Sequence, residues 1–147
     1  MIIWDIKSCS PVRHFYGPFI TGDSIDLSNE VIMTGSKLTG EQTMQMWEYT
    51  TCEHFTDINW DEGLPSEKQC PLFALQFEKN NGDIVIAGGG GMNEVKVFDG
   101  DMEFKPCAQI KDLSRGCYSV DWSNSGESFA IGGGDGVIRV FRVVKEV

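Results

Sequence analysis

The chain has 147 residues, a formal charge of −10 and a hydrophobic fraction of 41%, which fits one soluble globular domain with a buried core. No apolar run approaches the roughly 20 residues of a membrane-spanning helix, and with Asp5 so near the start we expect no signal peptide. The acidic balance disfavours nucleic acid as a partner, because phosphate backbones are repelled.

The predicted elements, taken in chain order, are short strands. Segments rich in Val, Ile, Phe and Trp follow one another, and none keeps a helical apolar period over a dozen residues. Several alternate between apolar and polar side chains, as half-buried strands do. The sequence therefore predicts an all-β protein with strands at 1–6, 31–36, 43–49, 73–77, 83–88, 94–99, 118–122, 128–133 and 137–141.

These strands belong to a repeating unit. Three similar segments open the units: SIDL at 24–27, ALQF at 74–77 and SVDW at 119–122. Each is followed by a turn, an apolar strand that ends in small residues, and a third strand with one aromatic residue. That aromatic position recurs at intervals of 43, 51 and 43 residues, as Trp4, Trp47, Phe98 and Phe141.

A repeat near 43 residues with three or four strands per unit resembles the WD-repeat β-propeller family. The residues that carry the resemblance are IWDI at 3–6, its weaker forms MWEY at 46–49 and VFDG at 97–100, and GGGDGVIRVF at 132–141. In the last segment, Asp135 lies in the turn where the family usually has its Asp. The resemblance covers essentially the whole chain.

The resemblance implies antiparallel blades with strands a to d. It places strands c and d at 2–16, a blade at 23–58, a blade at 72–110 and strands a to c of an incomplete blade at 117–142, thirteen strands in all. A closed ring needs at least about four blades. We therefore expect an open propeller of about 3 to 3.5 blades, the C-terminal portion of a larger one, completed by a missing half or by self-association.

The four consecutive glycines, Gly88 to Gly91, have two interpretations. A glycine run after a strand can cradle a phosphate, or it can form a tight turn. A dinucleotide loop has its third glycine five residues after the first and then a helix, but position 93 is Asn and a strand follows. The pattern predicts a turn, because no helix N-terminus is available for a phosphate. We expect no cofactor.

The five cysteines are odd in number, scattered, and contain no C-x-x-C pair. We expect neither a disulfide framework nor a metal site, and thiols in a reducing cytoplasm. Cys52 and His54 are two residues apart, which would put them on one face of an outer strand as a nucleophile and base or as half a metal site. No third orienting group is evident, so the pattern favours a polar pair without catalysis.

The longest insertion, at 59–70, is the first candidate for partner binding. Trp60 beside Asp61 and Glu62 has the composition of an aromatic anchor with an acidic rim. The alternative is a solvated acidic loop with Trp60 folded onto the sheets. Both interpretations stay open at the level of sequence.

By the resemblance, the loop at 36–43, with Lys37 and Glu41, neighbours the propeller face that family members most often use for partners. Arg115 precedes an inner strand and, by the same resemblance, lies near the central opening. An exposed charge is more often solvated than bound, so these residues are candidate contacts only.

The resemblance implies a non-catalytic scaffold for protein assembly in the cytoplasm, including cytoskeletal or ciliary assemblies, with basic partners favoured by the acidic charge. One alternative is a hydrolase or lyase with its site at the central opening, to which the inner strands contribute Asp26, Gln76 and Asp121. The two aspartates fit a repeated structural position better than an acid–base pair. The other alternative is a fragment without independent activity.

Overall fold

The structure is a computed structural model, and it describes residues 1–17, 19–38, 43–60 and 70–144. Within these ranges the chain forms thirteen β-strands and one short 3-10 helix, η2 (Gly100–Met102), and no α-helix. The all-β prediction is therefore confirmed. The described ranges contain no helix with the length and apolar character needed to cross a bilayer.

The strands form four antiparallel sheets that follow one another along the chain. The first sheet has only two strands, β1 (Ile2–Asp5) and β2 (Ser10–His14). The second contains β3 (Ile25–Ser28), β4 (Val31–Gly35), β5 (Met44–Glu48) and β6 (His54–Ile58). The third contains β7 (Leu72–Phe77), β8 (Ile84–Gly89), β9 (Val95–Asp99) and β10 (Lys105–Ile110). The last contains β11 (Cys117–Trp122), β12 (Ser128–Gly133) and β13 (Ile138–Arg142).

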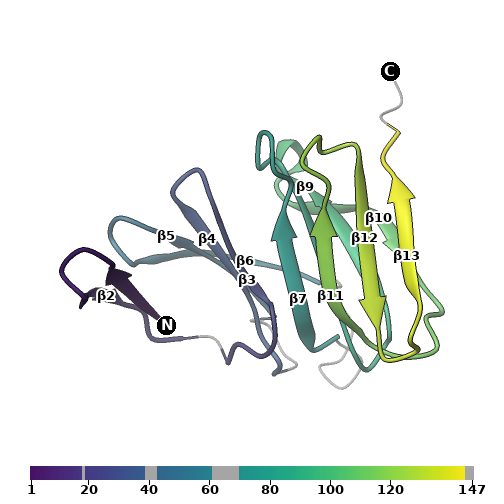
Figure 1. The fold of residues 1–147 in the computed structure, drawn as a ribbon, viewed down its shortest axis with the longest axis horizontal. Coiled ribbons are helices and arrows are strands. Elements are labelled where there is room, and N and C mark those ends of the chain that lie inside the picture. The colour runs from purple at the N-terminus through teal and green to yellow at the C-terminus, as the bar shows by residue number, and fades with distance from the viewer. Residues whose placement is uncertain (18, 39–42, 61–69, 145–147) are drawn as a thin grey trace.

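The four sheets stand in a row, each facing the next, with β1 and β2 at one end and β11 to β13 at the other (Figure 1). The first strands of neighbouring sheets lie side by side, β3 beside β7 and β7 beside β11. Asp23 donates its N–H to Phe73 O over 2.8 Å and accepts from Leu75 N over 3.0 Å, which ties the approach to β3 directly to β7. We call the side of a sheet turned toward the following sheet its forward face, and the opposite side its backward face.

Two apolar layers fill the spaces between the three larger sheets. Alternate residues of a strand point to opposite faces, so a sheet between two others must be apolar on both. In β7, Leu75 and Phe77 point backward into the first layer, whereas Ala74 points forward into the second. The first layer contains Met33, Met44, Met46, Leu75, Phe77, Val85 and Phe98. The second contains Ala74, Ile86, Val95, Val97, Val120, Trp122, Phe129 and Ile131.

The glycine run occupies the end of β8 and the turn before β9, and a strand rather than a helix follows it. A Cβ atom at Gly88 would lie 2.9 Å from Cys117 Sγ, so the absent side chain lets the last sheet approach. Gly91 has a φ of 69°, a left-handed conformation that glycine adopts without strain. Close packing and turn geometry thus account for these glycines.

Polar side chains of the first strands link neighbouring sheets. Asp26 Oδ2 accepts the N–H of Phe77 over 2.8 Å, and Gln76 Oε1 accepts the N–H of Trp122 over 2.6 Å. Asp26 and Gln76 hold equivalent positions in β3 and β7, since each lies two residues after the Ser or Ala that opens its repeat. Both side chains therefore serve the packing of one sheet on the next.

Candidate functional site

Trp60 lies inside the protein. Its indole is 2% exposed and packs with its ring centre 5.5 Å from that of Phe98. Its Nε1–H donates to Glu94 Oε1, and Lys96 Nζ donates to the Trp60 carbonyl oxygen over 2.7 Å. The Lys96 ammonium also lies 5.0 Å from the centre of the indole, within the range of a cation–π contact. This burial does not agree with the interpretation of Trp60 as an exposed aromatic contact for a partner. It agrees with the alternative, in which Trp60 is folded onto the sheets.

Three other predicted partner contacts, Asp61, Glu62 and Glu41, lie outside the described residues. The remaining two, Lys37 and Arg115, are both exposed.

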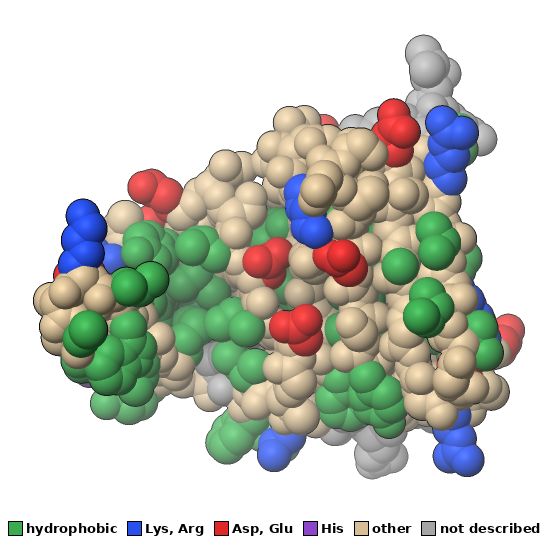
Figure 2. All heavy atoms as spheres, in the orientation of Figure 1, with side chains coloured by type: hydrophobic (Ala, Val, Ile, Leu, Met, Phe, Trp, Pro, Cys, Tyr) green, Lys and Arg blue, Asp and Glu red, His purple; other side chains and the backbone are tan. Residues whose placement is uncertain are grey.

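Lys37 and Arg115 lie at the same end of the sheets. Ser36 O accepts the N–H of Leu72 over 2.9 Å, which places the end of β4 against the start of β7. Gly116 O accepts the N–H of Gly134 over 3.0 Å, so the start of β11 meets the end of β12. We call this surface the loop end and define it as residues 36–38, 71–73, 90–93, 114–118 and 134–136. It forms the lower edge of the molecule, where basic and hydrophobic side chains lie close together (Figure 2).

Two aromatic side chains form the centre of the loop end. The ring centres of Phe73 and Tyr118 are 5.2 Å apart with a tilt of 33°, and Tyr118 is 53% exposed. A Cβ at Gly90 would lie 2.8 Å from the Phe73 ring. A Cβ at Gly134 would lie 3.0 Å from Tyr118 Cε2 and 3.3 Å from Arg115 Cβ. Arg115 and Tyr118 therefore cover the same glycine and form one continuous patch.

The sequence predicts Phe73 and Tyr118 only as strand residues and not as a pair at one surface. A signal for them exists, because each immediately precedes the four-residue segment that opens its repeat, ALQF in one case and SVDW in the other. Phe73 and Tyr118 lie near the starts of β7 and β11. Because these two strands are adjacent, the two aromatic side chains come to lie beside each other. Their adjacency is what the sequence alone did not supply.

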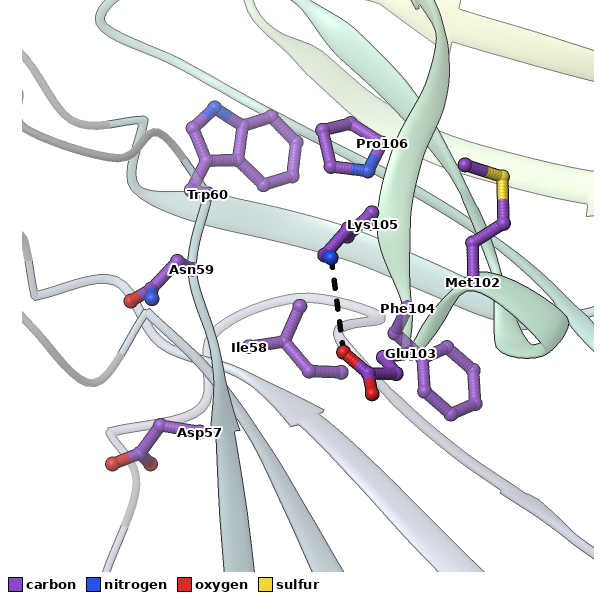
Figure 3. Close-up of a pocket in the computed structure, with 9 residues that line it drawn as sticks. All are labelled: Asp57, Ile58, Asn59, Trp60, Met102, Glu103, Phe104, Lys105 and Pro106. Atoms are coloured by element: carbon purple, nitrogen blue, oxygen red, sulfur yellow. Dashed lines mark ion pairs between the residues drawn. The ribbon is translucent and has the colours of Figure 1, made fainter.

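A groove opens between the outer strands of the second and third sheets (Figure 3). It has a volume of about 640 Å³. Lys105 Nζ and Glu103 Oε2 form an exposed ion pair of 3.7 Å at its rim, and Asp57 points away from them. Asp57 is instead held by His54 Nε2 at 2.8 Å and by Gln45 Nε2 at 3.2 Å. The groove has a mixed polar and apolar lining, and its carboxylates do not converge on one point.

The predicted pairing of Cys52 and His54 on one strand face is wrong. β6 begins at His54, and Cys52 lies before it in a turn with a φ of 65°. His54 packs edge-on against Trp47, with ring centres 5.1 Å apart, and contacts the carboxylate of Asp57. Cys52 packs against the apolar cluster of Phe15, Ile32 and Trp47, so both side chains lie near Trp47 but are not neighbours on one strand face.

Burial raises the pKa of the Cys117 thiol, and a thiol held protonated is a poor nucleophile and metal ligand. Among residues 1–17, 19–38, 43–60 and 70–144, no three His, Cys, Asp or Glu side chains gather in a way that could hold a metal ion.

Comparison with known proteins adds no assignment at this point. No family model matches the sequence, and no curated protein matches it. The function must therefore be argued from the repeat, the sheets and the loop end themselves.

Proposed function

We propose that this protein is a non-catalytic protein-interaction scaffold of the WD-repeat β-propeller type, and that partners bind at its loop end. Four successive antiparallel sheets support the propeller assignment, as does the repeat near 43 residues. The adjacency of β3, β7 and β11 gives further support, because blades arranged around an axis bring their first strands together.

The patch of Phe73, Tyr118 and Arg115 carries this proposal. Tyr and Arg are among the residues most enriched at the energetic centres of protein interfaces. A tyrosine contributes a large contact area at a small entropic cost, because it has only two side-chain torsions. The patch also rests on rigid strand ends, with glycines directly beneath the side chains.

The test is affinity capture with four forms of the chain: wild type, Tyr118→Ala, Arg115→Ala and Phe55→Ala. Phe55 is the matched control, because it is a similarly exposed aromatic residue on β6, away from the loop end. We expect the wild type and Phe55→Ala to capture the same proteins and Tyr118→Ala to lose them. Capture of an identical set by Tyr118→Ala and by Arg115→Ala, with all variants folded, would overturn the proposal.

A further inference from the structure

The forward face of the last sheet is exposed at positions that are buried in the two sheets before it. By strand register, Met44, Val95 and Ile138 hold one position, opposite the glycine near the end of the preceding strand. Met44 and Val95 are fully buried, whereas Ile138 is 77% exposed. Two residues further along, Met46 and Val97 are buried and Val140 is 71% exposed. The last sheet therefore has the apolar forward face of its neighbours, and no described residue covers Ile138 or Val140.

The glycines opposite these positions show the same difference. A Cβ at Gly35 would lie 2.9 Å from Leu72 Cβ, and one at Gly88 would lie 2.9 Å from Cys117 Sγ, in each case an atom of the following sheet. A Cβ at Gly132 would meet nothing within 4 Å. Gly132 thus allows a close approach that no described residue makes.

The hydrogen bonds that link one sheet to the next stop at the last sheet within the described chain. Asp26 and Gln76 each accept a backbone N–H from the following sheet. Asp121 holds the equivalent position in β11, and its exposed side chain accepts a hydrogen bond over 2.8 Å from Nζ of Lys79, a residue that follows β7 of the preceding sheet. The hydrogen bond from Lys79 is the main cause that holds the pKa of Asp121 below its ordinary value. The carboxylate is therefore charged at neutral pH.

The opposite end of the row exposes the complementary surface. Ile25 and Leu27 of β3 are equivalent to Leu75 and Phe77 of β7, which are buried against the preceding sheet. Leu27 is 51% exposed, because the first sheet has only two strands and covers β4 and β5 but not β3. An open hollow of about 450 Å³ remains there, lined by Ile2, Ile3, Ile25, Leu27 and neighbouring residues. Figure 2 shows hydrophobic side chains clustered at the β1–β2 end of the row and separate hydrophobic side chains over β12 and β13 at the other end.

We propose that the forward face of β11 to β13 in one copy of this chain packs on the exposed backward face of β3 in a second copy. This head-to-tail contact repeats, between β11 and β3, the packing that places the first strands of neighbouring sheets side by side within the chain. It lies beside the first sheet, which covers β4 and β5. Ile138 and Val140 would cover Leu27 and Ile25, just as Met44 and Met46 share one apolar layer with Leu75 and Phe77. The occupant is a second copy because the chain itself carries both halves of the contact. The inference does not depend on partner binding at the loop end.

Such a contact uses different faces on the two copies, so it either closes into a ring or continues to a further copy. The test measures the mass in solution by light scattering or sedimentation over a range of concentrations. We compare the wild type, Val140→Asp, Leu27→Asp and the control Phe55→Asp, whose substitution lies on β6. We expect the wild type and Phe55→Asp to self-associate, and Val140→Asp and Leu27→Asp each to be monomeric.

A mixture gives the decisive result. Val140→Asp retains its backward face and Leu27→Asp retains its forward face, so equal amounts of the two monomers must combine into one-to-one dimers. A monomeric wild type would overturn the proposal and leave the loop-end function untouched. Disruption by Val140→Asp but not by Leu27→Asp would also overturn it, because that pattern belongs to pairing between two forward faces. Circular dichroism checks folding, and Ile138→Ser and Ile25→Ser replace any variant that does not fold.

Discussion

Replacement of Trp60 by alanine tests whether the second and third sheets are joined as described. The indole is 2% exposed and packs on Phe98, so its removal opens a large cavity. Deletion of a buried aromatic side chain costs about 3–5 kcal/mol. The variant also removes the indole N–H that Glu94 accepts. Glu94 keeps its hydrogen bond from Gln109 and its ion pair with Lys96, so the lost apolar packing dominates the cost.

This loss is a large share of the stability of such a domain, which is ~7–20 kcal/mol at this length. For a chain of this size, each kcal/mol lowers Tm by about 2–4 °C. Thermal and urea unfolding followed by circular dichroism should therefore show Tm falling by ~6–20 °C for Trp60→Ala. Trp60→Phe keeps an aromatic ring but loses the indole N–H, so its Tm should lie between that of the wild type and that of Trp60→Ala.

A free energy of unfolding for Trp60→Ala within about 0.5 kcal/mol of the wild type, the range of ordinary surface substitutions, would refute this reasoning. It would mean that the loop carrying Trp60 does not pack on β9 in solution. An unchanged stability together with lost partner binding would restore the exposed-anchor interpretation.

Three further predictions use matched comparisons. Gly88→Ala should destabilise the protein by about 1–3 kcal/mol, because the new Cβ would lie 2.9 Å from Cys117 Sγ. Gly132→Ala should leave the Tm of the monomer unchanged, because a Cβ there meets nothing within 4 Å. Equal effects of the two substitutions on Tm would contradict the packing. Because the pKa of Asp121 is lowered, chiefly by its hydrogen bond from Lys79, the stability that this pair contributes is present at neutral pH and lost as pH falls through the pKa of Asp121. The pair is solvent-exposed, so Lys79→Met should lower stability at pH 7 by at most about 1 kcal/mol, and the difference from the wild type should vanish in acid; a difference in Tm that persists at pH 2 argues against this linkage. The acidic charge of −10 predicts that partner affinity weakens as salt screens the attraction, and an affinity that is constant between low and high ionic strength would count against basic partners.

The strands could be predicted from the sequence because their signals are local. Val95 and Val97 alternate with Lys96, and this pattern alone identifies β9. The repeat of SIDL, ALQF and SVDW likewise marks the first strand of each larger sheet.

The surroundings of Trp60 could not be predicted, because its polar partners Glu94 and Lys96 are 34 and 36 residues away in the chain. A tryptophan beside two acidic residues has the same composition whether it is exposed or folded inward. The burial of Lys96 under the indole was equally hidden, since a lysine between two strand valines normally points to solvent.

The loop end was predicted only in part for a related reason. Arg115 was recognised as a charge before an inner strand, but Tyr118 was counted among the strands and its exposure was not foreseen. The exposed fraction of a side chain at the end of an inner strand depends on how closely the neighbouring sheet approaches. The packing between sheets sets the distance between them, and the sequence of one strand does not determine it.

Within each sheet, the described strands pair in the order in which they follow one another along the chain, which has a consequence for how the molecule unfolds. Among the described strands, none is exchanged between sheets, so a terminal sheet can detach while the rest stays folded, as in other arrays of repeats. The sheet of β7 to β10, covered on both faces, should keep its amide hydrogens longest in deuterated water. If the terminal sheets unfold first, amide exchange rates should decrease from the two ends of the row toward β7 to β10, rather than be equal in all sheets.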